Sequence, residues 1–79
     1  MWKHGAIGIP AEDGKYTGVK YAAKVYDKGS QYGIEGGRIS KLTLKINGEI
    51  VANYDRGWDI KPTCDEANTA LAILLHDNK

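Results

Sequence analysis

The densest group of side chains that could bind or react lies in residues 53–59, Asn-Tyr-Asp-Arg-Gly-Trp-Asp. It supplies two aromatic rings, two carboxylates and one guanidinium, from Tyr54, Asp55, Arg56, Trp58 and Asp59. Tryptophan and tyrosine anchor many protein interfaces, and arginine donates paired hydrogen bonds to carboxylates and phosphates. The cluster therefore predicts a recognition patch. A structural alternative stays open, in which the aspartates pair with Arg38 or Arg56 and the Trp58 ring fills a corner between sheet and helix.

A second candidate segment is the glycine-rich stretch from residue 30 to residue 41, which contains Tyr32 and Arg38. Its backbone N–H groups and the Arg38 guanidinium would suit an anion or a carboxylate of a partner. It lacks the Gly-Lys-Ser/Thr end of a P-loop, so it is not predicted to bind phosphates in that way. The structural alternative is that the glycines turn the chain and form a bulge at the start of the next strand.

A third group consists of cations that alternate with other residues along two predicted strands: Lys20, Lys24, Lys41 and Lys45, with Tyr26 nearby. Lysines and aromatic rings on an open sheet face are typical of platforms that bind single-stranded nucleic acid. The rings are few here, and the aromatic motif of the commonest RNA-binding sheet is missing. Outward lysines also keep a sheet face soluble, so nucleic-acid binding is an alternative function and not the first one.

The sequence predicts no catalytic residue, metal site or cofactor. Cys64, His4 and His76 are far apart and match no metal-ligand spacing. Cys64 falls at a predicted helix start, where a thiolate would be stabilised, but a small buried side chain is the preferred interpretation. Asp55 and Asp59 would need a shifted pKa and a substrate cleft to act as acid and base, and the sequence indicates neither. We therefore expect a protein that is not an enzyme.

Length and composition favour one small globular domain over residues 1–79. The chain has 42% apolar and 27% charged residues and a net charge of +1. Seven basic and two acidic residues lie between positions 15 and 45, so the middle of the chain is basic. The single cysteine allows no internal disulfide and fits the cytoplasm. No signal peptide or membrane-spanning run is recognisable, so no membrane partner is expected.

These residues are expected to be positioned by a four-stranded antiparallel meander and one C-terminal helix, an α+β fold of β-β-β-β-α order. Alternation predicts strands over residues 2–9, 16–26, 38–46 and 49–54. The Asn47-Gly48 pair predicts a type I′ turn between the last two. A capping box of Thr63 and Glu66 predicts a helix from Cys64 to about His76. Its core stripe should be Ala67, Ala70, Leu71 and Leu74.

One helix covers only one face of a sheet, so the lysine-bearing face is expected to meet water or a partner. Residues 70–75 are apolar all round, and Ile73 and Leu75 therefore favour a homodimer. Pairing across the turn at residues 47–48 places Arg38 near Gly57. The loop around Tyr32 and the segment after Tyr54 should then lie side by side. We expect them to form one docking surface, with a protein as the first choice of partner.

Two segments carry a resemblance to a known family. Residues 30–42 (Ser-Gln-Tyr-Gly-Ile-Glu-Gly-Gly-Arg-Ile-Ser-Lys-Leu) and 51–62 (Val-Ala-Asn-Tyr-Asp-Arg-Gly-Trp-Asp-Ile-Lys-Pro) resemble the signature of a domain of unknown function. Its members are short proteins of phages, prophages and mobile elements of Gram-positive bacteria. The resemblance covers nearly the whole chain and implies a small accessory protein that binds or inhibits a host protein. Binding of a small anionic or nucleotide ligand is a further alternative.

Overall fold

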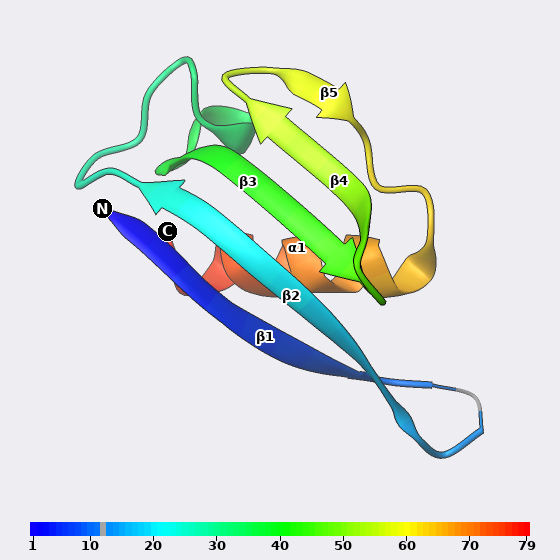
Figure 1. The fold of residues 1–79 in the computed structure, drawn as a ribbon. Helices are drawn as coiled ribbons and strands as arrows, with labels where there is room; N and C mark the ends of the chain where they lie inside the picture. The colour runs from blue at the N-terminus through cyan, green and yellow to red at the C-terminus, as the bar shows by residue number, and fades with distance from the viewer. Residues whose placement is uncertain (12) are drawn as a thin grey trace.

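The fold was analysed in a computed structural model, which describes residues 1–11 and 13–79. The strands are β1 (Trp2–Pro10), β2 (Tyr16–Val25), β3 (Ile39–Ile46), β4 (Glu49–Asp55) and β5 (Trp58–Ile60). A 3-10 turn, η1 (Ile34–Gly36), lies between β2 and β3, and the helix α1 (Asp65–Asp77) follows β5. The antiparallel sheet has the order β1-β2-β3-β4-β5, and α1 lies across one of its faces (Figure 1).

The α+β fold with an antiparallel sheet and one C-terminal helix is confirmed, but the prediction of four strands is wrong. The chain turns back after β4 and adds β5, with Tyr54 opposite Trp58 and Asn53 opposite Ile60. Arg56 takes a left-handed backbone conformation, with φ of 56°, which makes this tight reversal possible. A strand of three residues is too short to show alternation, so its sequence reads as part of a loop.

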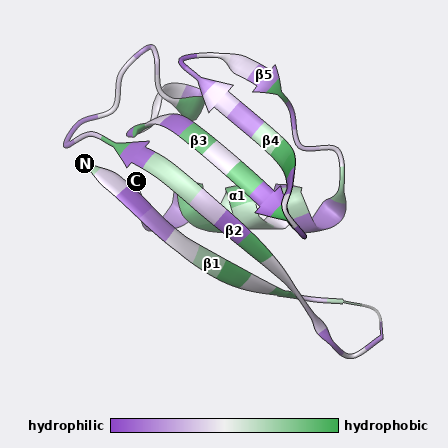
Figure 2. Ribbon diagram, in the orientation of Figure 1, coloured by the Kyte–Doolittle hydropathy of each residue, from purple (hydrophilic) through white to green (hydrophobic). Residues whose placement is uncertain are grey.

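The core lies between α1 and the face of the sheet that the apolar residues share. Val19, Ala23, Leu42 and Leu44 are almost completely buried there, as the alternation predicted. Ala67, Ala70 and Leu74 are buried on the helix, and Leu71 packs at the edge of the same cluster. Figure 2 shows hydrophobic and hydrophilic residues alternating along β2 and β3. Small alanines at the centre of the helix face let α1 lie close to the strands.

The turn at Asn47-Gly48 has the predicted type I′ conformation, since both residues have positive φ, 52° and 81°. The register of β3 and β4 nevertheless shifts by one residue, because Val51 is an extra residue between the Leu44–Ala52 and Lys45–Ile50 pairs. Ile50 is half exposed, whereas Ala52 and Tyr54 on the other side of this extra residue are buried. Lys41 therefore lies opposite Asp55 and not opposite residue 54.

The helix begins one residue later than predicted, and the Thr63 capping box is not formed. Cys64 is the N-cap residue, with extended backbone and no side-chain capping bond. Asp65 and Glu66 lie in the first turn, where their charges match the helix dipole. The other end is closed by Asn78, whose side-chain amide donates to the Leu74 carbonyl oxygen at 2.8 Å. Its side-chain oxygen accepts a bond from Lys3 Nζ at 2.8 Å, which ties the helix end to β1.

The long connection between β2 and β3 is held by backbone packed against backbone. A Cβ atom on Gly33 would overlap the carbonyl oxygen of Gly37, and one on Gly29 would come within 2.5 Å of the Gly36 carbonyl oxygen. Hydrogen bonds from Gly36 N to Gly33 O and from Gly37 N to Ile34 O close the same turn. The loop can therefore fold in this way only with glycine at both positions.

Among residues 1–11 and 13–79, no helix is long and apolar enough to cross a membrane. The α1 helix has 13 residues, against the ~20 that a membrane span needs.

Replacing Gly33 by alanine is expected to destabilise the fold, whereas alanine at Gly18 is expected to be tolerated. A Cβ at Gly33 collides with backbone, while one at Gly18 meets no atom within 4 Å and does not require a positive φ. Overpacking of this kind costs about 1–3 kcal/mol of unfolding free energy. Urea denaturation of both variants measures the difference. Equal stability of the two variants would contradict the backbone packing of the loop.

Candidate functional site

The face of the sheet opposite α1 is open and carries lysines that lie directly opposite one another. Lys24 pairs with Lys41, and Lys20 pairs with Lys45, across β2 and β3. Like charges in directly opposed positions repel, so this arrangement is destabilising by itself. Both pairs therefore leave positive charge concentrated along the centre of the face.

A cavity of about 520 Å³ lies at one end of this open face, where β2 ends and β3 begins. We call it the rim cavity. It is lined by residues from the β2 end, the glycine loop, β3 and the turn after β4: Lys24, Tyr26, Ser30, Tyr32, Ser40, Lys41 and Arg56. The cavity thus combines two groups that the sequence assigned to different functions. Tyr32 and Arg56 belonged to the expected protein-docking surface, while Lys24, Tyr26 and Lys41 belonged to the expected nucleic-acid face.

At the rim cavity, one hydrogen bond joins β4 to the glycine loop, and a second joins the β4–β5 turn to β3. The Tyr54 hydroxyl donates to the Tyr32 carbonyl oxygen at 2.9 Å. The Arg56 backbone N–H donates to the Ser40 carbonyl oxygen at 2.9 Å. The two segments that the meander was expected to place side by side therefore do meet. The side chain of Tyr32 remains 54% exposed beside them.

Tyr26 is the one described group whose pKa clearly departs from its ordinary value. The Lys24 ammonium beside the phenol favours the phenolate, and this lowers the pKa of Tyr26. Loss of hydration acts in the opposite direction, and Ser40 and Lys41 lower the pKa further. The same ammonium lies 5.5 Å from the centre of the Tyr26 ring. The phenol therefore lies in positive surroundings.

Asp55 faces the cations of the rim cavity at long range. Its Oδ1 atom is 3.8 Å from Lys41 Nζ and 3.6 Å from Arg56 Nε. All three side chains are substantially exposed, so these pairs are weak and can exchange for other partners. Asp59 accepts a bond from the Asn53 amide at 3.2 Å and lies outside the cavity lining. Pairing of Asp55 with Arg56 agrees with the structural alternative for the cluster.

Tyr54 and Trp58 contribute mainly to the fold. Tyr54 is only 7% exposed, and its ring meets the Trp58 ring edge to face, with the centroids 5.0 Å apart. Trp58 is half-buried and packs against the core cluster. Trp58 thus closes the edge of the sheet, while the Tyr54 hydroxyl holds the loop.

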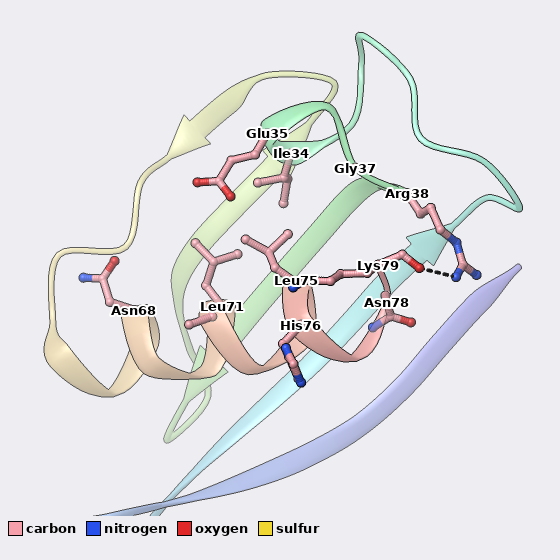
Figure 3. Close-up of a pocket in the computed structure, with 11 residues that line it drawn as sticks. Ile34, Glu35, Gly37, Arg38, Asn68, Leu71, Leu75, His76, Asn78 and Lys79 are labelled. Carbon is pink, nitrogen blue, oxygen red and sulfur yellow. Dashed lines mark hydrogen bonds between the residues drawn. The ribbon is translucent and has the colours of Figure 1, made fainter.

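Arg38 does not join the other residues of the expected docking surface. Its guanidinium donates to the Tyr26 carbonyl oxygen at 2.7 Å and to the Lys79 carbonyl oxygen at 3.0 Å. It lines a separate groove of about 530 Å³ on the helix side of the molecule, together with Ile34 and Leu71 (Figure 3). Arg38 therefore ties the end of α1 to the end of β2.

The sequence interpretation missed Ser40, which is buried beneath the rim cavity. Ser40 is the extra residue of a bulge, because Lys24 pairs with Lys41 while the next residue, Val25, pairs with Ile39. The signal was present in the sequence. Ile39 and Leu42 are both apolar and lie three positions apart, which strict alternation of a strand does not allow on one buried face.

The remaining residues with reactive side chains do not gather. Cys64 is half-buried at the start of α1, and His4 stacks on Trp2 at the far edge of the open face, with the ring centroids 6.2 Å apart. Within residues 1–11 and 13–79, no three histidine, cysteine, aspartate or glutamate side chains are grouped so that they could hold a metal ion.

Comparison with known proteins identifies a family for the chain. The family model described as "Domain of unknown function (DUF7678)" matches residues 1–79. No curated protein and no solved structure matches the chain.

Replacing Tyr54 by phenylalanine is expected to loosen the glycine loop without creating a cavity in the core. The variant keeps the ring and removes the 2.9 Å bond to the Tyr32 carbonyl oxygen, which should lower the unfolding free energy by about 0.5–1.5 kcal/mol. Tyr16→Phe is the matched control, because Tyr16 is 73% exposed on the β1–β2 hairpin. Denaturation curves measure both. An unchanged stability of Tyr54→Phe would show that the bond does not hold the loop.

The Tyr26 phenol is expected to titrate below the ordinary range of tyrosine. Lys24→Met should raise its pKa, since the variant removes the positive charge that favours the phenolate. Ring-carbon NMR signals followed against pH give the midpoint for each protein. A midpoint that does not move in Lys24→Met would contradict the contact between the two side chains.

Proposed function

The chain belongs to the family described as "Domain of unknown function (DUF7678)", and we propose that it is a small non-enzymatic binding module for a protein. The partner would present an acidic surface to the open sheet face and to the rim cavity. The contact residues would be Tyr32 and Arg56 at the centre, with Lys24 and Lys41 beside them.

The observation that carries the proposal is the meeting of an exposed aromatic ring and three cations at one hollow of an uncovered face. Tyr32 is exposed, but its backbone is fixed through the Tyr54 hydroxyl, so little conformational freedom is lost when a partner covers the ring. Aromatic and arginine side chains in such positions are the residues that most often dominate binding energy. This contact surface would be supported from beneath by the side chains of Tyr54, Trp58, Asp55 and Asp59. Arg38 would contribute from the helix side of the molecule, where it holds the ends of β2 and α1 together.

The origin and site of action are part of the same proposal. The resemblance to short proteins of phages, prophages and mobile elements of Gram-positive bacteria supports a host protein as the partner, which the module would inhibit by covering it. The single cysteine supports a reducing compartment, so the cytoplasm is the proposed location.

Nucleic-acid binding is the second candidate function, and the opposed lysines favour it. The Lys24–Lys41 and Lys20–Lys45 pairs would be relieved of repulsion by a phosphate backbone. The exposed rings of Trp2 and Tyr26 border the same face. Self-association through the helix stays a prediction: Ile73 is exposed on α1, while Leu75 already packs against the core cluster.

A photoreactive benzoylphenylalanine placed at position 32 is expected to cross-link to an acidic host protein in bacterial cells. The same residue placed at position 16 is the matched control, because Tyr16 is also an exposed tyrosine but lies on the β1–β2 hairpin, away from the rim cavity. Adding Arg56→Ala to the position-32 variant should reduce the yield, since the guanidinium would pair with the partner's carboxylates. Gel shifts and mass spectrometry of the adducts measure the result.

The outcomes of this experiment separate the two candidates. A position-32 adduct that is digested by nuclease and whose formation falls steeply with salt would support nucleic-acid binding. The same proteins captured from positions 16 and 32, or no adduct at position 32, would contradict a docking surface at the rim.

A further inference from the structure

The Ser40 hydroxyl is a buried polar group without a hydrogen-bond partner among residues 1–11 and 13–79. The residue is only 4% exposed, and it lies close enough to Tyr26 to lower the pKa of the phenol. A buried hydroxyl without a partner is unfavourable unless another group satisfies it. Ser40 lines the rim cavity, so a ligand in that cavity can reach the residue.

The charges around Ser40 indicate the chemistry of that ligand. Lys24, Lys41 and Arg56 line the same cavity, and Asp55, the one carboxylate that pairs with any of them in the described part of the chain, is held by long and exposed ion pairs. Three cations against one carboxylate leave two positive charges unbalanced. A group with two negative charges and several acceptor oxygens fits this arrangement better than a single carboxylate does.

We infer that the rim cavity binds the phosphoryl group of a ligand about the size of a mononucleotide. Lys24, Lys41 and Arg56 would contact the phosphate oxygens, and the Ser40 hydroxyl would donate a hydrogen bond to one of them. The inference goes beyond the proposed protein partner, because it concerns a small ligand that the chain would bind alone.

The size and walls of the cavity support this ligand class. A volume of about 520 Å³ lies within the ~300–1,000 Å³ range of small-molecule sites and exceeds what a phosphate alone would fill. The exposed Tyr32 ring lines the same cavity and offers a surface on which a base can stack. Bases stack well on tyrosine, so the ring and the cations can hold the two ends of one ligand.

The backbone at Arg56 supports the same interpretation. Its φ of 56° is a conformation that glycine or asparagine adopts more easily than arginine does. The guanidinium is kept at the cavity wall in spite of this, and the backbone N–H of Arg56 itself donates to the Ser40 carbonyl oxygen. Strained positions of this kind are concentrated at functional sites.

NMR titration of the purified chain tests the inference. Inorganic phosphate and adenosine monophosphate are added separately, and sodium chloride at matched ionic strength is the reference. We expect both phosphates to shift the amide signals of Ser40 and Lys41 and to saturate, with the nucleotide binding more tightly and also shifting Tyr32. Shifts no larger than those with chloride, or shifts without saturation, would overturn the site.

Four variants make the test specific. Lys41→Met and Arg56→Gln should each weaken phosphate binding by about tenfold or more, as loss of a charge-assisted bond does. Lys15→Met is the control with the same charge change, because Lys15 lies in the exposed turn between β1 and β2. Asp55→Asn should strengthen binding, since it removes the competing carboxylate. If Lys15→Met and Lys41→Met weakened phosphate binding equally, the affinity would depend only on the net charge of the chain, and the proposal would be overturned.

Ser40→Ala separates a bound phosphoryl group from a merely charged surface. The variant changes no charge, so it should weaken phosphate binding several-fold while leaving the unliganded fold as stable as before or more stable. Unchanged affinity in Ser40→Ala would remove the hydroxyl from the site. Saturable binding of a single-stranded oligonucleotide but not of the mononucleotide would also overturn the proposal. Because these measurements use the chain alone, their failure is distinguishable from a failure of the cross-linking experiment.

Discussion

The packing of backbone on backbone in the glycine loop is the constraint on which the candidate site depends. Gly33 lies against Gly37, and Gly29 lies against Gly36, with no space for a side chain at the first position of either pair. Only this tight fold places the Tyr32 carbonyl oxygen within reach of the Tyr54 hydroxyl. The exposed Tyr32 ring, the wall of the rim cavity and the position of Arg38 all follow from it. Glycines, which have no side chain, therefore determine where the binding side chains of the site lie.

One face of the sheet forms the core and stabilises the fold, and the opposite face carries the candidate binding residues. The face beneath α1 carries the apolar side chains, and small alanines on the helix allow the close approach that a thin core needs. The opposite face has no covering layer in the described chain, and it accumulates lysines in opposed pairs that weaken the sheet slightly. A domain this small has little stability to spare, so repulsion retained on its open face is consistent with a role for that face in binding.

The sequence predicted those parts of the fold that follow from local rules. The alternation of Leu42 and Leu44 and the Asn47-Gly48 turn were sufficient for the meander, and the alanine and leucine spacing was sufficient for the helix. Prediction from the sequence failed where one extra residue changed the register between two paired strands. Val51 and Ser40 are extra residues in their strands, and each moves its neighbours relative to simple pairing. The short β5 and the Cys64 cap depend on tertiary contacts, which no local pattern of residues 58–64 contains. For the site, the meeting of two distant segments followed from topology, and the spacing of Ile39 and Leu42 already indicated the bulge at Ser40, whereas the separation of Arg38 required coordinates.

The bulge at Ser40 belongs to the rim cavity and not to the division between the two faces of the sheet. Ile39 pairs with Val25 and Lys41 pairs with Lys24, so the residues on either side of Ser40 face two adjacent residues of β2. Deletion of Ser40 would make Ile39 and Lys41 neighbours, and the regular alternation of a strand would keep them on opposite faces. The shortened chain would therefore retain the core and the lysine face but lose the hydroxyl beneath the cavity. A single codon thus separates this site from the fold, and a lineage can lose the site without losing the domain.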